Sequence, residues 1–587
     1  MNILSIHVGH NATAALILNN KLEISLSEEK FTNIKNYSGF PLNSIKYIMN
    51  TYNLNADNID FVAIAGEYVP SVQIPDSKQH TNTSVTIEVY GLFFAALVSR
   101  YFGFTSPLFE NLYTFYQKKI KKKFSQTATI NLLKNLFGFR KDQIVFVHHH
   151  LCHSYAPIGF FNLHKQKEPV LIITQDGYGD TLAGMTGVYE NGNYKLLSTT
   201  SFVDSTAWLY AAVTKYLGMK ELEHEHKVMG LAAYPPKEYG MKVYKNKFED
   251  LITVKDTKIS LRYKTFLSGA YTYTVLRGRL YRERFDNIAF GIQQLIEDKI
   301  TEFVRQNIEK YKIKKIAFGG GLFMNVKLNK KIQELPDIEK CYFMPSCGDE
   351  MNAVGAAFYV LEKQGEFGFS NETMYLGKEY SDEEIERFFR ENELDKKYEL
   401  EKSKNINKEV AQLVAEGNIV GRFAGRGEVG ARSLGNRAIL ADPSKLESVE
   451  MINYAIKSRD FWMPFACSVL DSHFEDYAIF NGKSIPYYMI TAYDTTEDGK
   501  KHLKAAIHRK DYTMRPNVVK INHNKEYWDL INEYRKLTGI GGILNTSLNI
   551  HGYPLIGFIR ELFFTMDNSH LDISQCGNYI IRKKFKK

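Results

Sequence analysis

The sequence predicts an α/β protein built from two or three domains. With 587 residues, the chain is too long to fold around one hydrophobic core. Its hydrophobic content of 44% is typical of a globular protein. The order of elements is strand-rich, then helical, then strand-rich again, and one strand–turn–strand pattern occurs twice.

The two copies of this pattern indicate internal symmetry. The first copy spans residues 2–18, with small and polar residues at Gly9–Thr13, and the second spans 170–189, with its polar turn at Gln175–Asp180. Such a repeat is typical of the actin/Hsp70-like (ASKHA) ATPase fold, in which each of two lobes offers one turn to a phosphate group. We therefore expect a two-lobed domain of this class in the N-terminal part of the chain.

A histidine-rich motif predicts a metal site. His149 and His153 follow an apolar strand and are four residues apart, so a helix that begins here places both imidazoles on one face. Two imidazole nitrogens one turn apart suit a single metal ion. We expect Cys152 to face away from it. A histidine-rich helix start at a wet surface is the alternative interpretation.

Two later segments supply candidate partners. Asp349 precedes a predicted helix at 351–360, where it serves either as an N-cap or as the carboxylate that completes a His-His-Asp site. The triplet Gly319–Gly321 lies between a strand and a helix, where backbone amides and the absence of side chains favour a phosphate. An ordinary strand-to-helix turn is the alternative for the glycines.

Charge and composition limit the choice of partners. The net charge is +9, and dense basic runs occur only at Lys118–Lys123 and Arg582–Lys587, which we interpret as solvated faces rather than nucleic-acid sites. The five cysteines lack paired spacing, and no signal peptide is evident, so we expect a cytoplasmic protein. The most apolar stretch, Val89–Ser99, is half a bilayer span, so no membrane helix is expected.

Seven segments in a fixed order resemble one known family. They are GHNATAAL (Gly9–Leu16), SEEKFTNIKNYSGFP (Ser27–Pro41), HHLCH (His149–His153), HKVMGLAAY (His226–Tyr234), FGGGLFMN (Phe318–Asn325), GRGEVGARSLGNRAILADP (Gly425–Pro443) and GILNTSLNIHGYP (Gly542–Pro554). On these motifs the chain resembles the NodU/CmcH-type O-carbamoyltransferases over nearly its whole length.

The resemblance implies two domains with separate reactions. Residues 1–376 would form the actin-like carbamoyl-transfer domain, and residues 381–587 would form a YrdC-like α/β domain. The second would make carbamoyl-adenylate from carbamoyl phosphate and ATP, with Mg²⁺ expected beside the nucleotide. The first would transfer the carbamoyl group to a hydroxyl of a sugar, glycan or natural product, with Fe²⁺ or another divalent metal on the leaving phosphate.

The resemblance also assigns residues. It implies His149, His153 and Asp349 as metal ligands, with Asp176 either a fourth ligand or a contact to metal-bound water. His10 would be the base, and Lys35 would hold the carbamoyl oxygen. The nucleotide would lie along Gly177, Gly319, Gly320, Gly321 and Asn325. Carbamoyl phosphate and ATP would be bound by Arg432, Arg437, Lys457, Arg459, Arg515, Asn545 and Ser547.

The chain departs from the family pattern in its second part. Met463 and His551 stand where the family has arginines, and Ala431 replaces a proline. Neither Met nor neutral His replaces a bidentate cation. The donor is therefore either a different acyl or carbamoyl compound, or carbamoyl phosphate in a clamp rearranged around Arg509 or Lys510.

Three classes of function follow. The first is an O-carbamoyltransferase, and the second is a related transferase with another donor or a nitrogen or thiol acceptor. The third is a non-catalytic nucleotide- or RNA-binding relative, which only the basic runs support. We expect acceptor specificity within residues 67–123, where the motifs match poorly, and we consider a homodimer possible.

Overall fold

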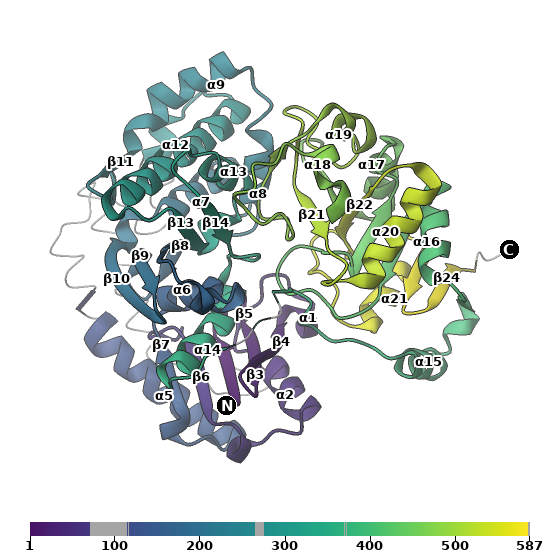
Figure 1. Cartoon of the computed structure of the whole chain (residues 1–587), viewed down its shortest axis with the longest axis horizontal. Coiled ribbons are helices and arrows are strands. Elements are labelled where there is room, and N and C mark those ends of the chain that lie inside the picture. Colours follow the sequence, from purple (N-terminus) through teal and green to yellow (C-terminus); the bar gives the residue numbers. More distant parts are fainter. Residues whose placement is uncertain (71–113, 116, 264–274, 369, 371, 585–587) are drawn as a thin grey trace. The chain divides into compact units, whose positions relative to one another are not determined.

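The chain forms two compact units in the computed structural model, which describes residues 1–70, 114–115, 117–263, 275–368, 370 and 372–584 (Figure 1). The N-terminal unit comprises Met1–Glu28 and Asn36–Glu372. The C-terminal unit comprises Thr373–Lys587 together with the short segment Glu29–Lys35. The N-terminal unit is therefore interrupted in sequence by seven residues that associate with the other unit.

The described part of the N-terminal unit contains two five-stranded mixed sheets of identical topology. The first has the order β4 (Lys21–Ser27), β3 (Thr13–Leu18), β1 (Ile3–His7), β6 (Phe61–Ala65) and β7 (Ile144–Val147). The second has the order β10 (Asn193–Ser201), β9 (Leu182–Glu190), β8 (Val170–Gly179), β13 (Lys315–Gly319) and β14 (Lys340–Phe343). In each sheet three antiparallel strands are followed by two parallel ones. The repeat expected from the two hairpins is thus present as duplicated sheets.

The end of one strand differs from the sequence prediction. The stretch Gln175–Asp180, expected as a turn, continues β8 as far as Gly179. The pairing of β8 with β9 shifts its register between Gln175 and Gly179. A bulge of this kind bends the strand and redirects its side chains, and Asp176 lies within it.

Two helices connect the sheets. Helix α14 (Asn352–Lys363) packs on β1, β3 and β6, whereas α6 (His149–Phe160) packs on β8 and β13, and the two helices pack against each other. Both are almost entirely buried, and the buried residues of α6 include its three histidines. Among the described residues of this unit, the other helices of eight residues or more are α2 (Leu42–Thr51), α5 (Lys122–Phe137), α7 (Thr206–Tyr216), α12 (Phe285–Tyr311) and α13 (Val326–Gln333).

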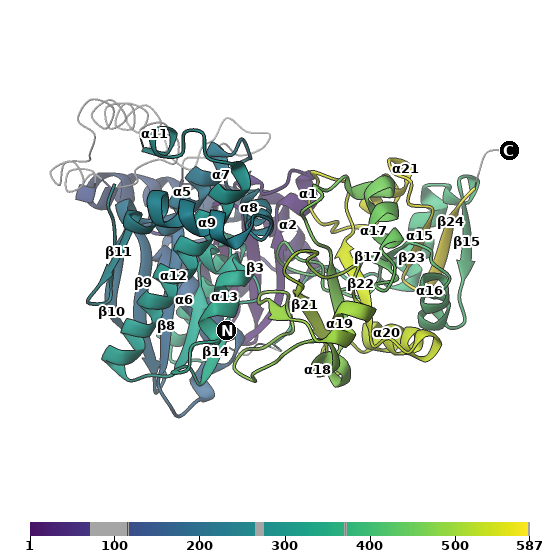
Figure 2. The same ribbon diagram turned by 90° about the horizontal axis from the view of Figure 1, so that it is seen from above.

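The described part of the N-terminal unit also contains shorter elements. They include β2 (Gly9–His10), β5 (Ser38–Gly39), β11 (Ile252–Lys255), β12 (Lys258–Leu261), α8 (Glu225–Leu231), α9 (Lys237–Val243), α11 (Arg277–Arg279) and the 3₁₀ turns η9 (Gly321–Met324) and η10 (Asp349–Met351). Helix α12 contacts α7, α8, α9 and α13, and Figure 2 shows this helical group in the turned view.

The C-terminal unit contains one eight-stranded mixed sheet among its described residues. Its order is β15 (Tyr398–Lys402), β24 (Tyr579–Lys583), β23 (Ile573–Cys576), β16 (Val420–Phe423), β17 (Arg437–Ala441), β22 (Gly542–Ser547), β18 (Ala466–Leu470) and β21 (Pro516–Val519). The helices of this unit are α1 (Glu29–Thr32), α15 (Asp382–Glu391), α16 (Ile406–Ala415), α17 (Glu447–Ile452), α18 (Phe474–Tyr477), α19 (Glu497–His502), α20 (Lys525–Thr538) and α21 (Ile559–Asp567). One core cluster of buried residues joins the sheet to α15, α16, α17, α18, α20 and α21. The whole protein is therefore a mixed α/β structure.

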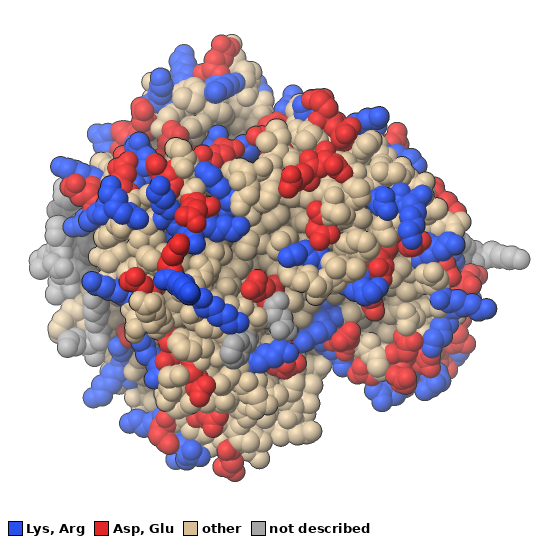
Figure 3. All heavy atoms as spheres, in the orientation of Figure 1, with Lys and Arg blue, Asp and Glu red and all other residues tan. Residues whose placement is uncertain are grey.

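The surface has no dominant charge on the face shown in Figure 3, where basic and acidic side chains are interspersed on both units. Among the helices that the structure describes, none has the length and hydropathy needed to cross a bilayer. Val89–Ser99, most of the expected acceptor region 67–123 and the last three residues of the basic tail lie outside the described residues.

The contact between α6 and α14 predicts a sensitive glycine. A Cβ added at Gly355 would lie 1.9 Å from the Cys152 carbonyl oxygen. We expect Gly355→Ala to lower the free energy of unfolding by about 1–3 kcal/mol or more, because the helices must separate. Gly278→Ala is the control, since its Cβ meets no described atom within 4 Å. Urea denaturation measures both, and equal stability of the two variants would contradict the prediction.

Candidate metal centre and cation cluster

Helix α6 begins at His149, as the spacing predicts, and its first turn is held by side chains. Asp180 Oδ2 accepts hydrogen bonds from the amides of His149, at 2.7 Å, and Glu67, at 2.8 Å. The His148 imidazole accepts from the His150 amide at 3.2 Å. These bonds satisfy amides that the helix leaves open, so the start of the helix and both metal-facing histidines are fixed.

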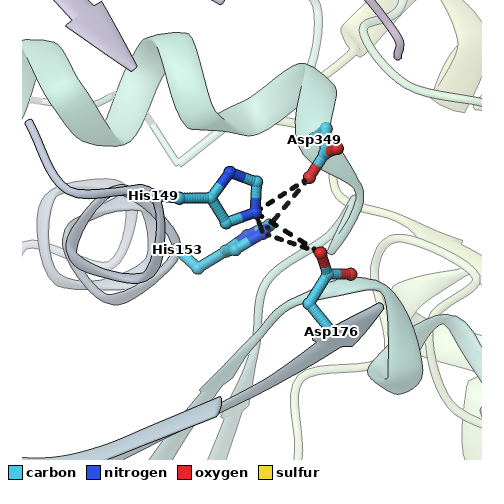
Figure 4. A group of neighbouring side chains, drawn as sticks. All are labelled: His149, His153, Asp176 and Asp349. Carbon is cyan, nitrogen blue, oxygen red and sulfur yellow. Dashed lines mark hydrogen bonds and ion pairs between the residues drawn. The ribbon is translucent and has the colours of Figure 1, made fainter. Parts of the chain in front are cut away.

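Four buried or half-buried side chains converge beside this helix (Figure 4). His149 and His153 come from α6, Asp176 from β8 and Asp349 from η10. The two histidine Nε2 atoms are 3.1 Å apart. Asp349 Oδ1 lies 3.4 Å from His149 Nε2 and 3.3 Å from His153 Nε2, and Asp176 Oδ2 lies 3.4 Å and 3.8 Å from the same atoms.

The arrangement fits one divalent metal ion. The four candidate ligand atoms lie within 4.8 Å of one another. Ligand atoms bound about 2.1 Å from one ion are roughly 3 to 4 Å apart, so the separations match. Two imidazoles and two carboxylates suit Fe²⁺, Mn²⁺ or Zn²⁺. Asp176 is placed like Asp349, and Cys152 is directed elsewhere, with its Sγ 3.6 Å from the Val147 carbonyl oxygen.

Three members of the cluster, His153, Asp176 and Asp349, have pKa values that favour their charged forms. Burial favours neutral His153, but hydrogen bonds and charges from Asp176 and Asp349 outweigh it and raise its pKa to about 9. Burial likewise opposes ionisation of Asp349, yet the histidines lower its pKa to about 2. The pKa of Asp176 lies well below its usual value for the same reason. A divalent cation would therefore displace a proton here.

Neighbouring groups orient the two carboxylates. The Gly321 amide donates to Asp176 Oδ1 at 2.9 Å, which leaves Oδ2 toward the imidazoles. The Asn352 side chain donates to Asp349 Oδ1 at 3.1 Å. Such partners fix the direction of a ligand before the metal arrives.

The glycine triplet is required by packing at this centre. Added Cβ atoms at Gly319 and Gly320 would lie 2.3 Å from the carbonyl oxygens of His153 and Gln175, respectively. Gly320 also has a φ of +94°, which side chains rarely adopt. The triplet thus has a structural reason to be glycine, and its expected contact with a nucleotide stays a prediction, as does that of Gly177.

Asn325 has partners of its own. Its side-chain oxygen accepts from the Leu328 amide at the start of α13, and its side-chain nitrogen donates to Gln293 at 2.9 Å. The side chain is therefore a helix cap within a polar network, and a role in nucleotide binding stays a prediction.

His7, which the sequence motifs did not single out, links the His10 backbone to the candidate metal centre. The His10 carbonyl oxygen accepts from His7 Nε2 at 3.0 Å, and the same Nε2 lies 3.8 Å from Asp349 Oδ2. Burial is the main reason that the pKa of His7 is lowered to about 4. A lone histidine at the end of an apolar strand carries no functional signal, which explains why sequence reasoning missed it.

The C-terminal unit gathers cations. Burial, followed by the charges of Arg432 and Arg459, holds the pKa of Arg515 well below its usual range. Burial and the charge of Arg432 lower the pKa of Arg459 to about 10. We call the interacting set the cation cluster; it contains Lys35, Arg432, Lys457, Arg459 and Arg515.

Neutral groups hold the cation cluster in place. Lys457 Nζ donates to Ser547 Oγ at 3.1 Å and to Asn549 Oδ1 at 2.6 Å. Burial, then the charges of Arg459 and Lys35, depresses the pKa of Lys457 well below its usual value. Buried and half-buried cations that repel one another favour a bound anion, which would relieve both the repulsion and the desolvation.

Two predicted donor-binding residues are not part of this set. Arg437 is fully buried, and its guanidinium donates to the carbonyl oxygens of Ala424, Gly425, Asn436 and Lys378. Asn545 donates to Ser433 O and Ser468 Oγ. Both side chains hold backbone and loops together in the structure.

Lys35 belongs to the C-terminal unit. Its segment is attached there by Lys30, which donates to the Leu555 carbonyl oxygen at 2.8 Å, and by Phe31, whose ring lies 4.7 Å from that of Phe558. Its positive charge lowers the pKa of Lys457. The expected role of Lys35 in holding the carbamoyl oxygen stays a prediction.

The two positions at which the family has arginines, Met463 and His551, differ in solvent exposure. Met463 is half-buried and His551 is exposed, as are Arg509 and Lys510. A clamp rearranged around Arg509 or Lys510 stays a prediction.

Comparison with known proteins identifies the class. The family model described as carbamoyltransferase N-terminus matches residues 2–358, and the one described as carbamoyltransferase C-terminus matches residues 411–583. The chain therefore belongs to the carbamoyltransferase family and is an enzyme of that class, which confirms the resemblance seen in the motifs.

Its relatives are distant. An uncharacterized protein of Methanocaldococcus jannaschii is 29% identical over 99% of both chains. Nodulation protein NolNO of Sinorhizobium fredii is 26% identical over 98% of this chain and 79% of the relative, and nodulation protein U of Rhizobium tropici is 25% identical over 52% and 51%. Among solved structures, HypF of T. kodakarensis is 10% identical, with a TM-score of 0.33 over 63% of this chain and 48% of that one.

The raised pKa of His153 predicts how metal affinity depends on pH. Its pKa is 6.5 ordinarily and about 9 in the cluster, so between these values a binding metal must displace its proton. We expect the apparent affinity for Zn²⁺ to rise about tenfold per pH unit from 6.5 toward 9. Calorimetric titration at several pH values measures this, with His153→Ala as the control that loses binding. A pH-independent affinity would contradict it.

Proposed function

We propose that the protein is an ATP-dependent O-carbamoyltransferase that forms carbamoyl-adenylate from carbamoyl phosphate and ATP and passes the carbamoyl group to a hydroxyl of a sugar or natural product. The observation that carries the proposal is the pairing, in one chain of this family, of the four-residue His/Asp centre with a five-membered cation cluster. The first suits a divalent metal, and the second suits polyanionic substrates.

We further propose a fold assignment for each part. The duplicated sheets support an actin-like ATPase-fold domain of two lobes over residues 1–376. The eight-stranded mixed sheet with its cation cluster supports a YrdC-like adenylate-forming domain over residues 381–587. The segment containing Lys35 would be the exception, because it contributes its charge to the second domain.

Adenylate formation is assigned to the C-terminal unit. Hydrolysis of carbamoyl phosphate releases phosphate and carbamate, and a carbamate oxygen then attacks the α-phosphorus of ATP as pyrophosphate leaves. Both substrates are polyanions, so binding them requires several cations at close range. Arg432, Arg459 and Arg515 would hold phosphate oxygens, while Lys457 and Lys35 add charge. Mg²⁺ is expected with the nucleotide.

Carbamoyl transfer is assigned to the N-terminal unit. The acceptor hydroxyl loses its proton as its oxygen attacks the carbamoyl carbon and AMP leaves. His10 is our candidate for the base, because an imidazole nitrogen can accept the proton of a hydroxyl. His149, His153, Asp349 and Asp176 would hold Fe²⁺ or another divalent ion, which supplies positive charge to the leaving phosphate. The nucleotide part of the adenylate would lie along the glycines at the end of β13.

A second candidate is a related transferase with a different donor or a nitrogen or thiol acceptor. Met463 and His551 favour it, because each replaces a family arginine and neither sits in the cation cluster as a fixed charge. The five cations of the cluster remain, so we rank this function second.

Separation of the two reactions predicts the behaviour of His149→Ala. We expect this variant to release pyrophosphate from ATP and carbamoyl phosphate within about twofold of the wild-type rate, because the cation cluster is intact. Zn²⁺ or Fe²⁺ binding should be lost, since one of two imidazole ligands is removed. If His149→Ala loses both metal binding and pyrophosphate release, the two reactions are not separate and one site performs both steps.

The cation cluster predicts a charge requirement. We expect Arg459→Met and Arg515→Met to lower kcat/KM for carbamoyl-phosphate-dependent pyrophosphate release by roughly 10–100-fold each, the loss expected for one charge-assisted hydrogen bond. The matched control is Arg387→Met, an exposed arginine on α15. If wild-type protein releases no pyrophosphate with carbamoyl phosphate but does so with another carboxylate, the second candidate function is favoured.

A further inference from the structure

His7 lies between the His10 turn and Asp349 in the N-terminal unit. It is the last residue of β1, and only 4% of its surface is exposed. Its Nε2 donates to the His10 carbonyl oxygen at 3.0 Å and lies 3.8 Å from Asp349 Oδ2. One N–H group therefore faces both the turn that carries His10 and the outer oxygen of Asp349.

The two carboxylate oxygens of Asp349 face different histidines. Its Oδ1 faces His149 and His153, at 3.4 and 3.3 Å, while its Oδ2 faces His7. A second link runs beside the first, since Asn11 Nδ2 lies 3.4 Å from Glu350 Oε2. The β1–β3 turn and the start of η10 are thus joined by two polar contacts at adjacent residues.

His7 also carries a feature that favours function over stability. Its Nδ1 is buried and has no hydrogen-bond partner among the described residues. A buried acceptor without a partner destabilises a fold, and an apolar side chain at the end of an apolar strand would avoid that cost. The buried Nδ1 gives the fold no stabilising hydrogen bond, so the contacts made by Nε2 beside the candidate metal centre are the ones through which His7 can act.

We propose that His7 is a positioning residue for the metal centre: it holds Asp349 in the orientation that presents Oδ1 to the metal, and it holds the turn that places His10 beside it. The inference rests on the proposed function, because it presumes a metal at His149, His153, Asp176 and Asp349. His7 acts through Asp349 and through the His10 backbone rather than on a substrate. Partners of this kind commonly change metal affinity or activity 10–100-fold.

The test uses Co²⁺ as the probe and the full-length protein. Co²⁺ affinity and the visible absorption of the bound ion are measured for the wild type, His7→Leu and His7→Gln. We expect His7→Leu to bind one Co²⁺ about 10-fold or more weakly, with an altered absorption band, because Asp349 is released. His7→Gln should stay within about threefold of the wild type, since its amide nitrogen can donate in place of Nε2.

Ser5→Ala is the matched control. Ser5 lies two residues earlier on β1, is fully buried and donates to the Ala63 carbonyl oxygen at 3.3 Å. This variant should change the unfolding midpoint but neither the Co²⁺ affinity nor the spectrum. The unfolding midpoint of each His7 variant without metal shows whether it is folded.

Each result has a defined meaning. Weakened Co²⁺ binding by folded His7→Leu, restored by His7→Gln, supports the positioning role. Equal Co²⁺ affinity and spectra for His7→Leu and the wild type overturn it and leave the metal centre standing, as does a His7→Gln protein as weak as His7→Leu. A wild-type protein that binds no Co²⁺ overturns the metal centre and the role of His7 with it.

Discussion

Two carboxylates and two imidazoles share one buried volume in the N-terminal unit, and much of the surrounding structure follows from that constraint. Negative charges in such surroundings require compensation by protons or by a cation. The helix that supplies the histidines approaches its neighbours at glycines: an added Cβ would lie 2.1 Å from the His149 ring at Gly179 and 1.9 Å from the Cys152 carbonyl oxygen at Gly355. Close packing therefore serves to bring four ligands from three elements to one point.

The C-terminal unit shows the opposite charge balance. Its cluster consists of lysines and arginines that depress one another's pKa values, held by neutral hydroxyl, amide and carbonyl groups. A polyanion is the partner that such a cluster stabilises. These opposite charge balances are the basis of the proposed division of adenylate formation and carbamoyl transfer between the two units.

Several features of the fold and site could be predicted because they depend on local spacing. The four-residue separation of His149 and His153 determines a shared helix face, and the repeated hairpins anticipated the two sheets of identical topology. Other features could not be predicted. Arg437 and Arg459 occur in equally basic motifs, yet Arg437 donates to the carbonyl groups of four residues, whereas Arg459 donates to the Pro464 carbonyl and the Thr546 hydroxyl and is affected by the charge of Arg432. The contacts of each arginine depend on segments that lie far from it in the sequence.

The sequence by itself determined the family, the mixed α/β class, the helix that begins at His149 and the residue types available for metal and phosphate, because these depend on composition, order and short-range periodicity. Only the tertiary structure decided that Asp176 lies beside Asp349, that Lys35 joins the C-terminal unit and that His7 contacts both Asp349 and the His10 turn. The physical reason is that each of these relations joins residues from different strands, helices or turns, and their distances arise from packing rather than from any local pattern.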